Sequence, residues 1–427
     1  MKVLIITYYW PPSGGSGVQR WLKFVKYLRD FDIEPVVYTV ENPRYAIEDK
    51  SLFNQVPKGV EVIRQPIFEP NTIFSFFGKK NKKQSSGFLH PNPSVFGRFL
   101  QYVRANYFIP DARKYWVKPS VKYLIKYIRT TKIDLIISTG PPHSIHLIAM
   151  ELKAKLGIKW ISDFRDPWTE IDYFHQLPLT KKSKKRHYEL EKEVLATSDA
   201  VIVVGATMKE RFRKFTKNIH VITNGFDTEN LCRTSDTDST FSITHIGMMN
   251  TDRNPKILWT ALKEISDENP DFKKELRIQL IGKIAPEVIE DIAIFNDNNV
   301  RIIDYLNHGE IQLYQQKSQL LLLVINKVPG AKGIITGKIF EYLQANRPIL
   351  AIGPKDGDAA SIINETGSGT MVDFDDKQKL KTTILHYYRD FKMKKLVIKS
   401  TDIQKYHRKN LTRKLAEVIN IVGKLKS

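Results

Sequence analysis

The feature that most constrains the fold is a series of short apolar runs spread along the whole chain. The first, Lys2–Thr7, contains Val-Leu-Ile-Ile, and such an uninterrupted run is typical of a strand buried on both faces of a parallel sheet. The series therefore predicts an α/β fold in which parallel strands alternate with helices. The further runs are Glu34–Thr39, Ile133–Ile137, Ala200–Val204, His220–Thr223, Ile278–Ile281, Val300–Ile303, Leu320–Ile325 and Ile349–Ile352.

A glycine-rich loop, Tyr8–Gly17, follows the first run, and a helix is expected after it. Where a strand, a glycine loop and a helix follow one another, backbone amides can approach an anionic group closely. Gly14, Gly15 and Gly17 are therefore candidates for binding a diphosphate, with a glycine turn that binds nothing as the alternative. A dinucleotide site is disfavoured, because Arg20 stands where the third glycine of that fingerprint would lie.

A second informative stretch is Gly333–Pro354, which indicates a glycine-bearing turn, a short helix and a buried strand. Lys338 and Glu341 are three positions apart and share one face near the start of that helix, just after Gly337. A cation at a helix N-terminus suits a diphosphate, and a carboxylate one turn later can accept hydrogen bonds from two ribose hydroxyls. The pattern favours a nucleotide-sugar site, and a weak exposed ion pair is the alternative.

This stretch resembles the donor-binding segment of the large retaining glycosyltransferase family 4, and other segments match that family in the right order over nearly the whole chain. The resemblance implies an α/β fold with two Rossmann-like domains facing each other across a cleft, known as GT-B. In that family two glutamates mark this segment, and the second binds the ribose. Glu341 matches the second glutamate, whereas Gly333 stands in place of the first.

The expected second domain opens with a strand that ends in a glycine turn at Gly247. In the family, an arginine follows this glycine and a lysine comes several residues later, and both bind the diphosphate. Met248 stands at the first position, and Arg253 is at or near the second, with Lys256 in reserve. The resemblance therefore implies that Gly247, Arg253 and Lys338 bind the donor. Two cations can stabilise a departing nucleotide without a metal, so we expect neither metal nor cofactor.

Two loops after predicted strands of the first domain carry the catalytic candidates. His143 is a candidate contact to acceptor or donor, whereas His146 is expected to pack in its helix, and no carboxylate or cysteine is spaced to complete a zinc site. Asp163, Arg165 and Asp166 gather at the end of another strand, where polar substrates bind in many α/β proteins. Arg165 occupies the place of a family histidine that contacts the donor sugar. An Asp–Arg pair that only braces the loop is the alternative.

The strand and helix pattern lapses at about 67–119, in an insertion that mixes aromatic and basic residues. The chain has 67 Lys and Arg residues against 46 acidic ones, a net charge of +21, which implies an anionic partner surface. The insertion suits a membrane interface or single-stranded nucleic acid, or else its aromatic residues pack on the first domain. A second basic cluster is Lys181–Arg186. The insertion contains Phe74, Phe77, Lys79–Lys83, Phe88, Phe96, Arg98, Phe99, Tyr102, Arg104, Tyr107, Phe108, Arg113 and Lys114.

The expected organisation is a first domain over 1–228, a second over 241–402 and a last helix over 403–427 that crosses back to the first. No apolar run reaches the roughly 18 to 20 residues needed to cross a bilayer, and no signal segment is evident. With a single cysteine, Cys232, the sequence fits a reducing compartment. We expect a cytoplasmic protein, peripheral on the inner face of the cell membrane where its basic surface contacts lipid.

These observations favour a glycosyltransferase that moves a sugar from a nucleotide-diphosphate sugar to a hydroxyl of a saccharide or lipid-linked acceptor, with retention and without a metal. The expected setting is the synthesis of cell-surface polysaccharide or glycolipid. Asp373 and Asp375 match an Asp-x-Asp metal motif, but acidic residues that cap the next helix explain them better. The alternatives are a nucleotide-sugar epimerase, a nicotinamide oxidoreductase and a non-catalytic nucleic-acid-binding protein.

Overall fold

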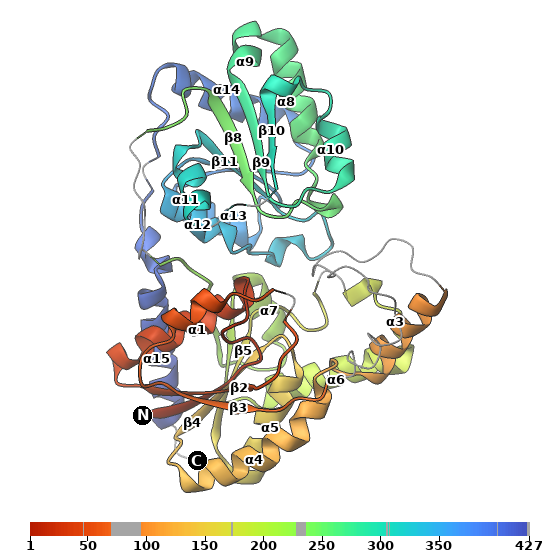
Figure 1. Ribbon diagram of the computed structural model, residues 1–427, viewed down its shortest axis with the longest axis vertical. Helices are drawn as coiled ribbons and strands as arrows, with labels where there is room; N and C mark the ends of the chain where they lie inside the picture. The colour runs from red at the N-terminus through yellow and green to blue at the C-terminus, as the bar shows by residue number, and fades with distance from the viewer. Residues whose placement is uncertain are drawn as a thin grey trace. The chain divides into compact units, whose positions relative to one another are not determined.

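The computed structural model describes residues 1–45, 47–69, 95–171, 174–227, 236–304, 306, 308–398 and 400–424. The chain forms two compact units (Figure 1). Unit 1 consists of Met1–Asn224 together with Arg408–Ser427, and unit 2 consists of Gly225–His407. Each unit has its own parallel sheet, and each is described by itself.

Unit 1 contains a seven-stranded parallel sheet in the order β3-β2-β1-β4-β5-β6-β7. The direction of winding therefore reverses between β1 and β4. In folds of this kind, ligands bind outside the carboxyl ends of the strands at such a reversal. The strands are β1 (Lys2–Ile6), β2 (Glu34–Val40), β3 (Glu61–Gln65), β4 (Leu135–Gly140), β5 (Lys159–Phe164), β6 (Ala200–Val203) and β7 (Ile219–Val221).

The first strand shows why an apolar run is needed at the centre of this sheet. Leu4 and Ile6 belong to the core on one face, and Val3 and Ile5 belong to the core on the other. Helices α4 to α7 cover the first face, whereas α1 and α15 lie side by side against the second (Figure 1). The helices are α1 (Ser16–Leu28), α3 (Val95–Tyr107), α4 (Val117–Thr130), α5 (Ser144–Leu156), α6 (Lys181–Thr197), α7 (Ala206–Phe212) and α15 (Arg408–Lys424), with short 3₁₀ turns at Arg29–Phe31, Lys50–Gln55, Lys114–Trp116 and Phe174–Gln176.

Unit 2 contains a six-stranded parallel sheet in the order β10-β9-β8-β11-β12-β13, which reverses between β8 and β11. Leu321 and Leu323 of β11 pack against Ile339 and Phe340, so the predicted short helix is fixed to the sheet by its apolar face. The elements are β8 (Phe241–Ile246), α8 (Lys256–Glu268), α9 (Pro270–Glu275), β9 (Leu276–Ile281), α10 (Pro286–Ile292), β10 (Val300–Ile303), α11 (His308–Lys317), β11 (Leu320–Val324), α12 (Lys338–Ala345), β12 (Ile349–Ile352), α13 (Asp358–Thr366), β13 (Gly369–Val372) and α14 (Lys377–Lys392), with 3₁₀ turns at Thr251–Arg253, Asp297–Asn299, Ala331–Gly333 and Ile403–Tyr406.

The predicted fold class, α/β with two parallel sheets, is confirmed. The sequence did not indicate β3 or β13, because β3 is a partly exposed edge strand and β13 is only half-buried. The cap of α14 is Asp376, whose side chain accepts a hydrogen bond from the backbone N–H of Lys379 at 3.0 Å. Asp375 instead pairs with Lys327 at 2.7 Å, so the Asp-x-Asp pair is not the cap.

Some expectations fall on residues that lie outside the described ranges. These are most of the linker, which includes Cys232, and the part of the insertion between Pro70 and Ser94. Among the residues that the structure describes, no helix has the length and apolarity that crossing a bilayer requires.

Candidate functional site

The glycine loop of unit 1 joins the carboxyl end of β1 to the start of α1. Gly15 precedes the helix with a φ of +79°, a conformation that favours glycine. Gly14 packs so closely against Ile47 that a Cβ on Gly14 would be 2.8 Å from Cγ2 of Ile47. A Cβ on Gly17 would be 3.3 Å from Nη1 of Arg165. The loop therefore needs glycine for its own packing, which is independent of any ligand.

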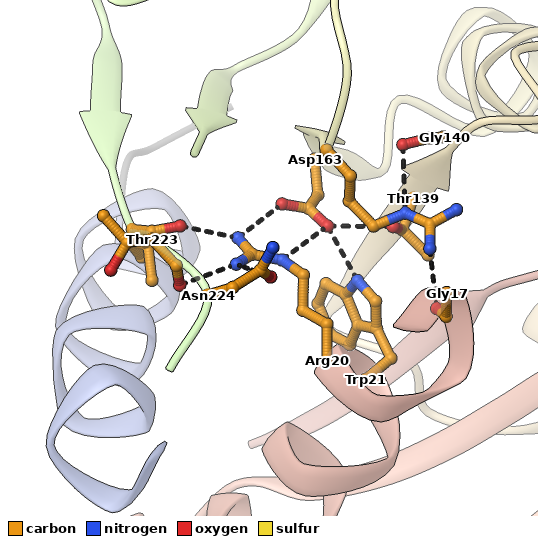
Figure 2. Close-up of polar contacts among 10 residues, drawn as sticks. Gly17, Arg20, Trp21, Thr139, Gly140, Asp163, Thr223 and Asn224 are labelled. Atoms are coloured by element: carbon orange, nitrogen blue, oxygen red, sulfur yellow. Dashed lines mark hydrogen bonds and ion pairs between the residues drawn. The ribbon is translucent and has the colours of Figure 1, made fainter. Parts of the chain in front are cut away.

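Asp163 lies at the end of β5 and is the centre of a buried polar cluster (Figure 2). Arg20 donates to both carboxylate oxygens, at 2.8 and 3.3 Å. Nε1 of Trp21 and the hydroxyl of Thr139 donate to Oδ2, at 2.7 and 2.8 Å. Burial alone would raise the pKa of Asp163, but the charge of Arg20 and these hydrogen bonds hold it below its ordinary value.

This geometry corrects the interpretation of Asp163 as a polar contact to substrate. Its side chain is fully buried, and both oxygens are already engaged within unit 1. Arg20, which the sequence only marked as a poor match to a dinucleotide fingerprint, is its partner. The same guanidinium donates to the carbonyls of Ile222 and Thr223, at 2.9 and 2.8 Å. The cluster ties α1 to β5 and to the last residues of the first segment of unit 1.

Arg165 also makes contacts that differ from the expectation. Its Nη1 donates to the carbonyl of Gly17 at 2.6 Å, its Nε donates to the carbonyl of Gly140 at 3.2 Å, and its Nη2 donates to the carbonyl of Pro141. Arg165 therefore joins the glycine loop to the end of β4, and its contact with the donor sugar stays a prediction. Asp166 is exposed, and its charge acts on Arg165. Of the three charged candidates in this loop, Asp166 is the one placed at the surface.

His143 lies at the start of α5, beside the end of β4, and its ring stacks on Trp168 with centroids 4.7 Å apart. His146 is fully buried and stacks on Phe164, as expected for a residue that packs in its helix. Nδ1 of His143 and Nε2 of His146 are buried and have no hydrogen-bond partner among the described residues. Both nitrogens face Gly140, where a Cβ would lie 3.0 and 2.5 Å from them.

Three buried histidines are held neutral in this part of unit 1. Burial lowers the pKa of His146 to about 3 and the pKa of His187 to about 4, and it lowers the pKa of His143 well below its ordinary value. His143 is only 8% exposed. At neutral pH it can therefore exchange hydrogen bonds with a substrate but carries no charge.

The described part of the insertion and the start of α6 form one exposed face. Asn106 of α3 donates to the carbonyl of Pro178 at 2.8 Å and accepts from the backbone N–H of Thr180 at 2.7 Å, so the two helices are joined. Arg113 is not part of this face, because it pairs with the buried Glu69 at 2.9 Å. The α3–α6 surface consists of the exposed residues Arg98, Phe99, Tyr102, Tyr107, Lys181, Lys182, Lys184 and Lys185.

In unit 2, Lys338 lies against the glycine turn that follows β8. Gly247 has a φ of +103°, and a Cβ there would be 2.6 Å from Cε and 2.8 Å from Nζ of Lys338. Gly282 directly follows β9, and a Cβ there would lie 2.9 Å from the carbonyl carbon and oxygen of Gly247. Two glycines thus let the ammonium group of a helix residue reach the carboxyl end of the central strand.

Arg253 spans the point where the winding of the second sheet reverses. Its Nε donates to Oδ1 of Asn326, just after β11, at 2.9 Å. Its Nη1 donates to the carbonyl of Met248, just after β8, at 3.0 Å. Lys256, the reserve candidate, pairs instead with Asp291 at 3.2 Å and is largely exposed.

Glu341 is exposed in the first turn of α12, and its Oε2 accepts from Nε2 of Gln315 at 3.2 Å. Gly337 immediately precedes the helix with an ordinary φ of −57° and open space around its Cα. The structure therefore brings Gly247, Arg253, Lys338 and Glu341 to one end of the second sheet.

Burial lowers the pKa of Lys338 to about 7, and the nearby charge of Arg253 acts in the same direction, whereas Glu341 opposes it. Two cations held this close with one exposed carboxylate create a site whose charge a phosphate group would balance. Among the described residues, no three His, Cys, Asp or Glu side chains gather as metal ligands would.

Sequence reasoning missed His245, which is fully buried and lies 3.2 Å from Nζ of Lys338. A histidine in the strand that leads into the glycine turn, two positions before Gly247, was the available signal.

The sequence model of Glycosyltransferase Family 4 matches residues 15–230, just over half of the chain. No curated protein matches significantly.

Among solved structures, sucrose-phosphate synthase from Thermosynechococcus elongatus is similar with 11% identity and a TM-score of 0.62, covering 99% of this chain and 98% of that one. HepE from Anabaena, in complex with UDP-glucose, has 14% identity and a TM-score of 0.61, covering 99% and 100%. TarM has 13% identity and a TM-score of 0.62, covering 98% of each chain. Taken with its two parallel sheets, these likenesses show that the chain has the GT-B fold and belongs to glycosyltransferase family 4.

Proposed function

We propose that this glycosyltransferase moves a sugar from a nucleotide-diphosphate sugar to the hydroxyl of an acceptor. The observation that carries the proposal is the position of Lys338 over Gly247, with Arg253 on the same end of the sheet and Glu341 one turn along the helix. Lys338 and Arg253 would bind the diphosphate, and Glu341 would accept hydrogen bonds from the ribose. Gly337 leaves open space beside the helix start for the donor to approach.

The reaction is proposed to retain the anomeric configuration and to need no metal ion. Lys338 and Arg253 supply the positive charge that stabilises the departing diphosphate, and the departing phosphate can itself take the proton of the acceptor hydroxyl. This route requires no dedicated base. A route without a dedicated base is compatible with the side chains of unit 1. The carboxylate of Asp163 is already paired with Arg20, and the low pKa of His143 makes its ring a weak base.

The acceptor is proposed to be a saccharide or a lipid-linked saccharide of the cell surface, and the enzyme to work at the cytoplasmic face of an anionic membrane. The α3–α6 surface supports this proposal, because it combines exposed aromatic side chains with several cations and because α3 is held to α6 through Asn106. Aromatic rings at the level of the headgroups and lysines near anionic lipid are the usual components of interfacial binding.

The donor is tested with UDP-, GDP- and ADP-sugars in thermal-shift and transfer assays. UDP-sugars come first, since HepE was solved with UDP-glucose and a similar Escherichia coli structure with UDP-2-fluoro glucose. One nucleotide class should stabilise the native chain, and Glu341→Ala should weaken that binding by about 1.5 to 3 kcal/mol, typical of hydrogen bonds to a charged group.

Glu287→Ala is the matched control, because Glu287 is also an exposed glutamate in the first turn of a unit 2 helix. It should leave nucleotide binding unchanged. If no nucleotide sugar stabilises the chain, or if both variants behave alike, the proposed donor site is wrong. Product that forms from the donor when the acceptor is omitted would instead favour the epimerase alternative.

A further inference from the structure

His245 lies in the middle of unit 2 and makes polar contacts on both sides of its ring. It belongs to β8 and is fully buried. Its Nδ1 is 3.0 Å from the carbonyl oxygen of Leu322 on the neighbouring strand β11, and its Nε2 is 3.2 Å from Nζ of Lys338 on α12. The imidazole therefore connects the two strands at the winding reversal with the helix that carries the candidate phosphate-binding lysine.

The carbonyl of Leu322 fixes the tautomer of this ring. A carbonyl oxygen only accepts hydrogen bonds, so Nδ1 of His245 must carry a proton. In a neutral ring Nε2 is then a bare acceptor, and Nζ of Lys338 donates to it. Burial, followed by the charges of Lys338 and Arg253, holds the pKa of His245 well below its ordinary value, against the opposing effect of the Leu322 and Met248 carbonyls. The ring is thus neutral when the lysine is charged.

The helix is fastened at a second point one turn further on. The hydroxyl of Tyr342 accepts from the backbone N–H of Ile246 at 3.1 Å and donates toward the carbonyl of Leu322 at 3.5 Å. Tyr342 is four residues after Lys338 and therefore on the same face of α12. Because the helix is held by Tyr342, the contact with His245 is needed only to place the end of the lysine side chain.

The chemistry of this partner is unusual for a lysine in unit 2. Eight of the other lysines that the structure describes in this unit pair with carboxylates, which offset their charge. Lys338 instead has a neutral acceptor, and the charged groups that act on it are Arg253 from the 3₁₀ turn Thr251–Arg253 after β8 and the exposed Glu341 of its own helix. These lysine–carboxylate pairs are Lys256–Asp291, Lys263–Asp267, Lys327–Asp375, Lys332–Asp356, Lys377–Glu264, Lys381–Glu264, Lys381–Glu268, Lys392–Glu275 and Lys405–Glu365.

We propose that His245 is a positioning residue for donor binding: its neutral imidazole holds the ammonium group of Lys338 over Gly247 and leaves the positive charge of that group available to the diphosphate. This inference rests on the proposed function, because it takes Lys338 as a phosphate-binding group. A carboxylate in the place of His245 would hold the lysine equally well but would compete with the anion for its charge.

Two substitutions separate the positioning role from simple packing. His245→Gln keeps a neutral acceptor at about the reach of Nε2, whereas His245→Asn can still donate to the carbonyl of Leu322 but withdraws the acceptor from Lys338. The pKa of Lys338 is measured by competitive acetylation with trace acetic anhydride and mass spectrometry. It should fall by about one pH unit in His245→Asn and stay near the native value in His245→Gln, because a lost hydrogen bond to the ammonium disfavours the charged form.

Binding of inorganic pyrophosphate, measured by calorimetry, tests the consequence for an anion without assuming a base or a sugar. At pH 7.5 the dissociation constant should rise about tenfold in His245→Asn and no more than about threefold in His245→Gln. His220→Asn is the matched control, because His220 is a half-buried histidine of unit 1. An equal loss in both His245 variants, or an unchanged or higher pKa of Lys338 in His245→Asn, would overturn the proposal.

A measurement on the native chain covers the case in which a His245 variant fails to fold. In ¹⁵N-histidine spectra, His245 should remain protonated at Nδ1 and bare at Nε2 from pH 6 to 8. A protonated Nε2 in this range would overturn the proposal. If the pKa of Lys338 responds to His245→Asn but neither pyrophosphate nor any nucleotide sugar binds the native chain, the positioning role stands and the donor site is wrong.

Discussion

Arg20 of α1 and Asp163 of β5 form a buried ion pair, with 2.8 Å between Nη2 and Oδ1 and with side chains only 2% and 0% exposed. Further donors from Trp21 and Thr139 complete the shell around the carboxylate. Because these contacts join α1, which follows the glycine loop, to β5, which Arg165 directly follows, the pair fixes the geometry at the carboxyl end of the first sheet.

Breaking this pair should destabilise unit 1 strongly. Asp163→Asn and Arg20→Met should each lower the free energy of unfolding by about 3 to 5 kcal/mol, because each leaves the other charge buried without its partner. The double variant should lose much less than the sum of the two, as denaturant unfolding can measure. Glu34→Gln is the control, since the side chains of Arg29 and Glu34 are 33% and 46% exposed and the loss of this pair should cost no more than about 1 kcal/mol. Fully additive effects of the two core substitutions would contradict this account.

Gly247→Ala should disrupt the second site through both backbone and side chain. The φ of +103° is strained for alanine, and the new Cβ would lie 2.6 Å from Cε of Lys338. We expect a loss of about 1 to 3 kcal/mol in stability and at least tenfold weaker binding of the nucleotide donor. Gly337→Ala is the control for stability, because its backbone is ordinary and a Cβ there meets open space. Native-like donor binding by Gly247→Ala would show that Lys338 need not approach this turn.

Donor binding should weaken as the pH rises through neutrality. The pKa of Lys338 is lowered to about 7 by burial and by Arg253, so its ammonium form, which attracts a diphosphate, is lost above that value. Affinity for the preferred nucleotide should fall by up to about tenfold for each pH unit between 7 and 9, until the bound phosphate itself keeps the lysine charged. Lys338→Met should bind more weakly at pH 6.5 and show no such decline in calorimetric titrations. A native affinity that is constant over this range would place the ionisation elsewhere.

Unit 1 should lose stability as the solution is made acidic. His143, His146 and His187 have lowered pKa values in the folded chain, so the unfolded chain takes up protons first, near pH 6.5. Their contribution is therefore complete above about pH 6.5 and decreases below it, by up to about 1.4 kcal/mol per pH unit for each histidine. Glu191 opposes this trend, because burial raises its pKa.

Urea unfolding between pH 7.5 and 4.5 measures this slope. His187→Gln should reduce the dependence of the unfolding free energy on pH by the contribution of one histidine. This holds whether or not the substitution changes the stability at pH 7.5. His175→Gln should leave the slope unchanged, because His175 is exposed. A slope that does not depend on His187 would mean that other groups control the acid response.

The α3–α6 surface should bind anionic vesicles. In co-sedimentation with vesicles of phosphatidylglycerol and phosphatidylcholine, Lys181→Glu/Lys184→Glu should lose most binding, since each cation near anionic lipid contributes about 1 kcal/mol. Lys273→Glu/Lys274→Glu makes the same charge change on α9 of unit 2 and serves as the control. Equal losses in both double variants would indicate a response to net charge alone. Binding to single-stranded nucleic acid in place of vesicles would favour the other interpretation of the basic insertion.

Much of the fold could be predicted, because a strand buried on both faces leaves an uninterrupted apolar run. Val3 to Ile6 show this, since alternate residues enter different cores. The edge strand Glu61–Gln65 left no such signal, because its residues are half-buried or exposed. This segment is a strand because it pairs with β2. Its own residues do not indicate that pairing.

The site was less predictable, because its contacts join residues far apart in the chain. The sequence analysis assigned both Lys338 and Gly247 to donor binding. Their close approach, however, depends on how α12 packs against the sheet that contains β8. For Asp163 the expected brace was a residue of its own loop, whereas the actual partner, Arg20, lies 143 positions earlier. Charged residues near strand ends could be recognised, but their partners could not.

The contribution of α15 to unit 1 has a consequence for how the chain is made. Leu411, Leu415, Ile419 and Val422 belong to the same core as Val3 and Trp21, although all of unit 2 is synthesised between them. Domains generally fold as units while they leave the ribosome, the N-terminal one first. Here the contiguous unit 2 can complete itself during translation, whereas the first-made unit exposes an unfinished apolar face until the final helix emerges. Biogenesis should therefore run against the order of synthesis, with chaperone protection needed at the beginning of the chain.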